Sequence, residues 1–165
     1  MKTTFPASRL PSLAVFLGLV CSNASHAAQT VLVDMAPVGH YTINTDTVVD
    51  NKTGLTWQRS PAPSASAPAT YTQAAAATYC AALSLGGYSS GWRVPTANEL
   101  LSIVDDHANY PSIDSVAFPN TPANSFYWTS TPQFLNASNN VVVRLGLDGG
   151  MATTGTSVYY VYCVH

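Results

Sequence analysis

Two cysteines, Cys80 and Cys163, constrain the fold of this chain more than any other feature. The third cysteine, Cys21, lies in an N-terminal segment that we expect to be cleaved on export (see below). Paired thiols persist as disulfides in exported proteins. The sequence therefore predicts one bridge, which joins a helix to the last strand. In the chain-entropy model, closing so long a loop stabilises the fold by about 4 to 5 kcal/mol. A metal or nucleophile role is disfavoured because CxxC spacing is absent and no histidine stands at a ligand interval.

Residues 1–27 have the order of a secretory signal peptide: two basic side chains, a short apolar run, then small residues. The apolar run is far shorter than the roughly 20 residues that a membrane span needs. We expect cleavage after Ala27, with cleavage after Ala28 as the alternative. A lipoprotein acylated at Cys21 is a competing interpretation, disfavoured because bulky Val20 stands where that processing prefers a small residue. The protein is expected to be secreted, to the periplasm, the cell surface or the medium.

The expected mature chain, residues 28–165, is acidic. It carries four Lys and Arg residues against eight Asp and Glu residues, a net charge of −4. Nucleic acids and anionic membranes require clustered basic residues, but here the four cations are scattered singly. Neither nucleic acid nor membrane insertion is therefore expected. A length of about 138 residues suits one domain with its own core.

The first half of the mature chain has the pattern of short strands. Residues 31–33 and 41–43 are expected as strands, and residues 47–57 as a hairpin around an Asp-Asn-Lys-Thr-Gly turn. Trp57 is expected to point into the core. Residues 60–69 are almost wholly Pro, Ala and Ser, a composition that predicts a mobile surface loop.

Two helices and three strands are expected in the second half. Residues 70–85 have helical propensity up to a Gly-Gly stop, and Thr96 with Glu99 forms a capping box that opens a helix to about residue 106. Three prolines break residues 107–125 into a long ordered loop. Strands are expected at 126–131, 141–147 and 158–164, with a Gly-Gly turn at 149–150 between the last two. This order describes an α+β domain.

Several blocks of this sequence occur in the same order in a known family: residues 47–59 (TVVDNKTGLTWQR), Tyr79-Cys80, residues 85–105 (LGGYSSGWRVPTANELLSIVD), 118–121, 127–130 and 160–164. Together they resemble the Lcl C-terminal domain family, named for the C-terminal domain of a bacterial collagen-like adhesin. The family is similar to C-type lectin-like domains, in which a first-helix cysteine pairs with one in the last strand. The resemblance implies a C-type lectin-like α+β fold over residues 28–165, with two helices packed on a mainly antiparallel sheet and a long loop region.

The resemblance also implies a secreted or surface module for ligand binding, linked in the family to adhesion, glycan binding and biofilm formation. Fold alone does not fix the ligand. The chain lacks Gly-X-Y repeats, and its acidity disfavours sulfated polysaccharides. It also lacks the tripeptides by which lectin-like domains bind sugar through calcium. We expect a non-enzymatic module that binds a glycan or another surface or matrix component. The alternative is an accessory subunit of a pilus or fibre that binds protein.

Two neighbouring groups of polar and aromatic residues are the candidate ligand contacts. Tyr127 and Trp128 alternate along a strand, so only one is expected to face the core and the other to be free for contact. Arg144 is expected on a partly exposed strand face near other polar residues. The candidate ligand-binding residues are Tyr127, Trp128, Asn139, Asn140, Arg144 and Asp148.

Other conspicuous side chains are expected to be structural. Trp92 and Arg93 can stack on sugars or bind carboxylates, but Trp92 is expected in the core and Arg93 beside Glu99 or Asp105. No catalytic residue, metal site or cofactor is expected, because zinc-protease spacing, a nucleophile elbow and a phosphate-binding glycine loop are all absent. The acids at 46 and 50, with Asn51, lack the spacing of a calcium loop.

Overall fold

β-Branched residues on either side of a tight turn fold the first part of the computed structural model into a three-stranded antiparallel sheet. Its strands, in spatial order, are β1 (Tyr41–Ile43), β2 (Thr47–Asp50) and β3 (Thr56–Gln58). The buried Asp50 carboxylate accepts hydrogen bonds from Lys52 N at 2.9 Å and Thr53 Oγ1 at 2.6 Å, which closes the turn. Gly54 adopts φ +76°, a conformation that favours glycine. The predicted hairpin is confirmed.

The structure describes residues 39–62, 68–134, 136–146, 151–153 and 157–165, which all belong to one compact unit. The predictions of a signal peptide at 1–27, a strand at 31–33 and a turn at 149–150 lie outside these residues. Within the described part of the chain, no helix is long and apolar enough to span a membrane.

A second antiparallel sheet forms from the later strands, β4 (Ser125–Gln133), β5 (Asn136–Leu145) and β6 (Met151–Thr153), in that spatial order. The strands predicted at 126–131 and 141–147 correspond to β4 and β5. The short third strand, β6, was not predicted.

The two helices are both shorter than the sequence indicates. They are α1 (Gln73–Ala81) and α2 (Ala97–Leu101). Thr72 caps α1, because Tyr71 forms an extended backbone pair with Tyr159 and cannot join the helix. The Thr96–Glu99 capping box opens α2 as predicted. The helix ends early because the Ser102 hydroxyl donates to the Glu99 carbonyl at 2.7 Å, which competes with further helical bonding.

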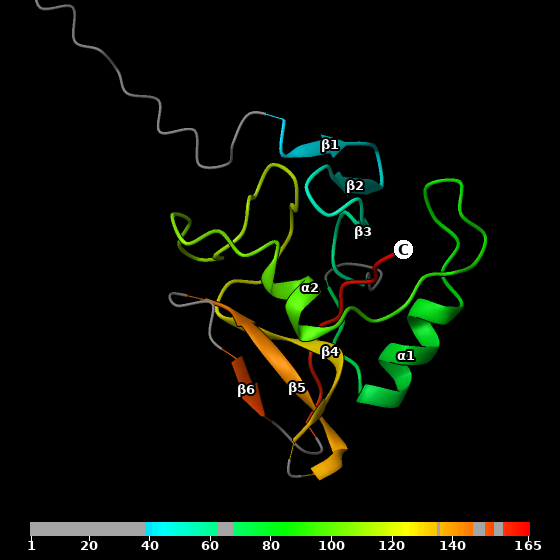
Figure 1. Ribbon diagram of the computed structural model, residues 1–165, viewed down its shortest axis with the longest axis vertical. Helices are drawn as coiled ribbons and strands as arrows, with labels where there is room; N and C mark the ends of the chain where they lie inside the picture. Colours follow the sequence, from blue (N-terminus) through cyan, green and yellow to red (C-terminus); the bar gives the residue numbers. More distant parts are fainter. Residues whose placement is uncertain (1–38, 63–67, 135, 147–150, 154–156) are drawn as a thin grey trace, which may run out of the picture. The chain divides into compact units, whose positions relative to one another are not determined.

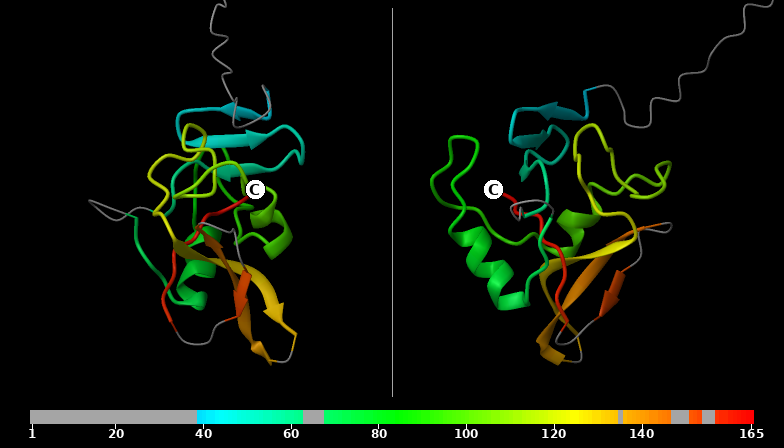
Figure 2. Two further views of the ribbon diagram at one scale, coloured as in Figure 1. Left: turned by 90° about the vertical axis from the view of Figure 1, so that its left-hand side faces the viewer. Right: turned by 180° about the vertical axis from the view of Figure 1, so that it is seen from behind.

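The C-terminal segment, residues 157–165, joins the two sheets, as the red trace in Figure 2 shows. The strand predicted at 158–164 is instead a series of isolated pairings, among them Trp57 with Val164 and Tyr127 with Tyr160. Val161 O accepts from Ala62 N at 3.1 Å, which holds Ala62 fully buried. The surface loop predicted at 60–69 is therefore wrong at Ala62, because a small side chain fits where the backbone packs inward.

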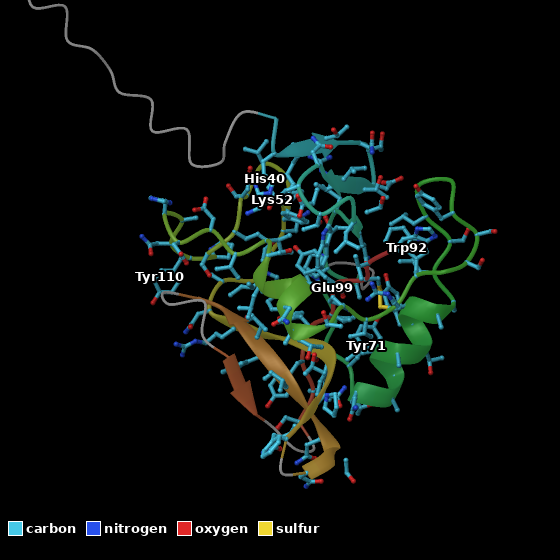
Figure 3. The ribbon with its side chains drawn as sticks, in the orientation of Figure 1. His40, Lys52, Tyr71, Trp92, Glu99 and Tyr110 are labelled. Atoms are coloured by element: carbon cyan, nitrogen blue, oxygen red, sulfur yellow. A yellow bond between two sulfur atoms is a disulfide. The ribbon has the colours of Figure 1, made fainter. Side chains whose placement is uncertain are left out.

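The predicted disulfide is present and joins α1 to this segment. Cys80 and Cys163 are bonded at 2.01 Å, 83 residues apart in the sequence. The yellow bond is visible beside α1 in Figure 3. The helix and the last segment are thus covalently linked.

Two buried clusters cover opposite faces of the second sheet. One contains Tyr127 and Val143 together with Leu100 of α2 and Val48 of β2, so that α2 packs between the two sheets (Figure 1). The other contains Trp128, Val142, Trp92, Val94, the disulfide, Ala62, Ala76 and Val161. Because the side chains of a strand alternate, neighbouring residues of β4 and β5 enter different clusters. The described residues form a mixed α+β fold.

Candidate functional site

The two aromatic residues predicted as a ligand contact are both buried. Tyr127 is 0% exposed and Trp128 is 1% exposed. The expectation that one of them faces outward is wrong, because both faces of the second sheet are covered. Burial also raises the pKa of Tyr127, so its hydroxyl stays neutral. Tyr127 is therefore a core residue.

Trp128 and Asn140 do come together, beside a small depression of about 110 Å³. Their polar groups are already used within the fold: Trp128 Nε1 donates to Tyr71 O at 2.7 Å, and Asn140 Nδ2 donates to Thr129 O at 2.8 Å. These bonds hold β4 to its neighbours. The two side chains therefore have few free polar atoms to offer a ligand.

The remaining predicted contacts are not gathered into one site. Asn139 lies on the opposite face of β5 from Asn140, and its amide donates to Gln133 Oε1 at 3.5 Å. Arg144 is partly exposed, as expected, but lies four residues from Asn140, about 13 Å along an extended strand. Asp148 lies outside the described residues.

The residues expected to be structural lie in the core or form an ion pair. Trp57 is fully buried and Trp92 is 3% exposed. Of the two acids considered for Arg93, the structure selects Glu99, with two contacts of 2.8 and 2.6 Å. These bonds, with a further one from the Thr96 amide, lower the pKa of Glu99 to about 2.

A larger depression, of about 180 Å³, opens at the first sheet. It lies where β3 ends, between the β1–β2 connection and the turn after α1. We call it the Gln58 pocket, and its wall consists of Thr45, Asp46, Gln58, Arg59, Ser60, Pro61 and Leu85.

Gln58 gives this pocket a buried polar group with unused bonding capacity. The residue pairs with Thr47 in the sheet and is 5% exposed. Its Nε2 donates to the Tyr79 hydroxyl at 2.9 Å, while Oε1 is buried and has no partner among the described residues. The amide can be flipped, yet either orientation leaves one polar atom unpaired. Burial raises the pKa of Tyr79, which keeps this hydroxyl protonated.

Arg59 and Asp46 place opposite charges on the same wall. Arg59 Nη1 donates to Thr45 O and Nη2 to Val116 O, each at 3.3 Å, while its Nε is buried without a partner in the described part of the chain. Asp46 is exposed, and its backbone carbonyl accepts from Arg59 N at 2.9 Å. Neither side chain forms an ion pair with another described residue. The pocket therefore offers both donors and acceptors.

The sequence alone does not predict this pocket, because its wall is formed by three segments that are far apart in the chain. In the sequence, Gln58 and Arg59 are part of the strand segment at 47–59, and Asp46 lacks the spacing of a calcium ligand. The available signal was Gln58 itself, an amide next to Trp57 in a buried strand, where an unsatisfied polar group is costly. The described residues hold no group of three His, Cys, Asp or Glu side chains placed to bind a metal ion.

Comparison with known proteins adds one match. Residues 46–165 match the family described as the Lcl C-terminal domain. The match begins at Asp46 and includes β2 and every later described element, while β1 precedes it. Neither the curated proteins nor the solved structures give a match.

Proposed function

The chain belongs to the Lcl C-terminal domain family, and we propose that it is a non-enzymatic binding module of the cell exterior that recognises a glycan in adhesion. We also propose that its α+β arrangement is C-type lectin-like. A disulfide that links the first helix to the last segment supports that fold, and disulfides are typical of exported proteins.

The Gln58 pocket is the observation that carries this proposal. More than nine in ten buried polar groups in folded proteins are hydrogen bonded. On one wall, the exposed Asp46 carboxylate is directly accessible, and two buried atoms of adjacent residues, Gln58 Oε1 and Arg59 Nε, have no partner among the described residues and can pair with a ligand once their side chains rotate towards the pocket. Sugar hydroxyls both donate and accept hydrogen bonds. A carbohydrate is therefore the ligand class that matches this mixture of groups.

The test measures glycan binding by the exported protein and by an Asp46→Asn variant. Binding is first screened on a glycan array and then quantified by calorimetry. Loss of a hydrogen bond to a charged group costs about 1.5 to 3 kcal/mol, so Asp46→Asn should weaken binding about tenfold or more. Asp106→Asn is the matched control, since Asp106 is exposed and outside the pocket wall. An array without any bound glycan, or equal affinities for wild type and Asp46→Asn, would refute the proposed site.

A protein partner in a pilus or fibre is the second candidate function. Phe134, a large apolar side chain that is 99% exposed, is the residue at which such a contact can be tested. Co-purification with an envelope polymer that is lost in Phe134→Ser, together with no glycan binding, would favour this function over the first.

Export is part of the proposal and is tested separately. We expect the mature protein to begin at Ala28 or Gln29. Intact-mass measurement of the protein recovered from outside the cytoplasm checks this, and a mass that includes residues 1–27 would contradict it.

A further inference from the structure

Two exposed aromatic rings and a buried third one pack together close to the Gln58 pocket. The rings of Tyr88 and His165 are stacked, with centroids 3.9 Å apart and planes inclined by 26°. Trp92 meets both rings edge-on, at 6.2 Å from Tyr88 and 5.7 Å from His165. Tyr88 is 39% exposed and His165 is exposed, whereas Trp92 is buried beside them. We call these three residues the aromatic shelf; Figure 3 labels Trp92.

The backbone on both sides holds the shelf in place. His165 N donates to Thr56 O at 2.8 Å and Thr56 N donates to His165 O at 3.0 Å. Tyr88 exchanges two hydrogen bonds of 3.0 Å with Leu85. A Cβ at Gly91 would lie 2.8 Å from His165 Nε2, so a side chain there would displace the imidazole. The exposed rings are therefore preorganised, which lowers the entropy that a ligand must remove on binding.

The shelf and the Gln58 pocket share their supporting elements. Leu85 belongs to the pocket wall, and its backbone partner Tyr88 belongs to the shelf. On β3, Thr56 holds His165 and Gln58 lies two residues further, about 7 Å along the strand. Adjacent units of an oligosaccharide can span such a separation. The supports of the shelf and of the pocket are therefore adjacent along β3 and in the turn after α1.

We propose that the shelf and the pocket together bind a neutral oligosaccharide, an inference that rests on the proposed glycan-binding function. One pyranose unit stacks its C–H face on the exposed Tyr88–His165 pair, because the negative face of an aromatic ring attracts electropositive hydrogens. The hydroxyls of the neighbouring unit donate hydrogen bonds to the exposed Asp46 carboxylate on the pocket wall. The expected mature charge of −4 repels sulfated or carboxylated sugars, and on the pocket wall the Asp46 carboxylate offsets the positive charge of Arg59.

The experiment titrates the full exported protein with four probes: cellotetraose, chitotetraose, mannotetraose and, as the charged comparison, dextran sulfate. Affinity is measured by calorimetry, and a change in tryptophan fluorescence serves as a second readout. We expect at least one neutral tetrasaccharide to bind more tightly than dextran sulfate. Stacking energies predict that Tyr88→Ala weakens that binding about threefold to tenfold. Tyr88→Phe keeps the ring and should stay within about twofold.

Controls separate loss of the shelf from loss of the fold. Phe134→Ala removes another exposed aromatic side chain, outside both surfaces, and should bind like wild type. Circular dichroism and thiol titration check that each variant is folded and disulfide-bonded. If Tyr88→Ala is misfolded, Tyr88→Leu replaces it, since leucine keeps apolar contact but has no ring to stack.

Each outcome decides between the two proposals. Neutral binding that is insensitive to loss of the Tyr88 ring overturns the shelf and leaves the glycan function standing. Preferred binding of dextran sulfate overturns the neutral ligand and also leaves the glycan function standing. No binding to any of the four probes, with an empty glycan array, overturns both.

Discussion

The Glu99 carboxylate serves two neighbours at once. Its Oε2 accepts hydrogen bonds from Arg93 Nη1 at 2.8 Å and from the Thr96 amide at 2.7 Å, while Oε1 accepts from Arg93 Nη2 at 2.6 Å. The side chain of Glu99 is 22% exposed and that of Arg93 is 47% exposed. One side chain thus caps α2 and fixes the segment that precedes it.

The stability of the protein should therefore depend on pH in the acid range through Glu99. Its pKa is lowered from the ordinary 4.5 to about 2, first by the hydrogen bonds from Arg93. A lowered folded-state pKa stabilises the fold above pH 4.5, and this contribution is lost as the pH falls from 4.5 towards 2. Solvent screening at the half-exposed Arg93 limits the effect to about 1 kcal/mol.

The variant Glu99→Gln measures this contribution. Glutamine keeps an acceptor for the Thr96 amide but has no charge. Urea unfolding of wild type between pH 5 and pH 2 should show a loss of stability that is about 1 kcal/mol larger than in Glu99→Gln. Parallel loss of stability in both proteins would contradict the assignment, and Asp106→Asn controls for the removal of an exposed acid.

Side chains that interact locally could be predicted from the sequence, and those that depend on distant segments could not. The Thr96–Glu99 box and its pairing with Arg93 lie within seven consecutive residues, 93–99. The burial of both Tyr127 and Trp128 depends on the C-terminal segment, where Tyr162 stacks on Tyr127 and Tyr159 packs edge-on against Trp128. Alternation alone cannot show that the second face of a sheet is covered.

Among the helices and strands, α2 is the one that depends most on its cap. It has five residues, too few to be stable without tertiary contacts. Of its N-terminal amides, Glu99 N donates to Thr96 Oγ1 at 3.2 Å and Ala97 N donates to Thr131 Oγ1 at 2.9 Å, and Leu100 anchors the helix between the sheets. The cap and the buried side chains of Ala97 and Leu100 thus position the helix.

Removal of the cap should destabilise the protein measurably. Thr96→Ala should lower the free energy of unfolding by about 1 kcal/mol, because an N-cap hydroxyl typically contributes that much. Thr96→Ser keeps the hydroxyl and should cost only a few tenths of that amount. Chemical denaturation of the three proteins at neutral pH provides the comparison, and equal losses in Ala and Ser would show that the methyl group, not the cap, matters.

The ends of the helices and strands show where tertiary contacts override the local preference of the sequence for helix or strand. Propensity extends the first helix over residues 70–85, but Tyr71 pairs with Tyr159 and the helix begins only at Gln73. The last segment has strand propensity over 158–164, but it passes from one sheet to the other and forms only isolated bridges with each instead of a continuous strand. Partners far away in sequence thus decide where each element begins and ends.

For the molecule as a whole, the C-terminal segment, residues 157–165, is the part that pairs with both sheets. Val164 pairs with Trp57 and Arg93, and Tyr160 pairs with Tyr127. Burial raises the pKa of Tyr162 and of Tyr127 well above the ordinary value of 10. Burial disfavours the charged phenolate, so both hydroxyls stay protonated in the folded protein.

Alkaline solution should therefore unfold the protein cooperatively. A raised folded-state pKa stabilises the fold below the unfolded value of about 10, and this stabilisation is lost as the pH rises beyond it. Tyr127 and Tyr162 should ionise only when the protein unfolds. Their phenolate absorbance should then rise together with the loss of circular dichroism, whereas ionisation of every tyrosine before unfolding would contradict their burial. Tyr127→Phe should reduce the size of the cooperative step.

The disulfide is the covalent link on which this convergence depends. Among the residues of α1, only Ala76 and Cys80 are buried, so the helix has little apolar contact of its own. The bridge to Cys163 supplies its main attachment, and Tyr79 of the same helix bonds to Gln58 in the pocket. Loss of the bridge should thus release α1 first and disturb the pocket next.

The double variant Cys80→Ala/Cys163→Ala tests this order. Opening a loop of this length should lower the free energy of unfolding by about 4 to 5 kcal/mol. Hydrogen exchange should accelerate in α1 more than in β2 and β3, because the sheet keeps its own backbone bonds. Glycan affinity should fall as well, since Tyr79 no longer holds the Gln58 amide. Unchanged exchange in α1, at unchanged stability, would mean that the buried packing of the helix against the C-terminal segment suffices without the bridge.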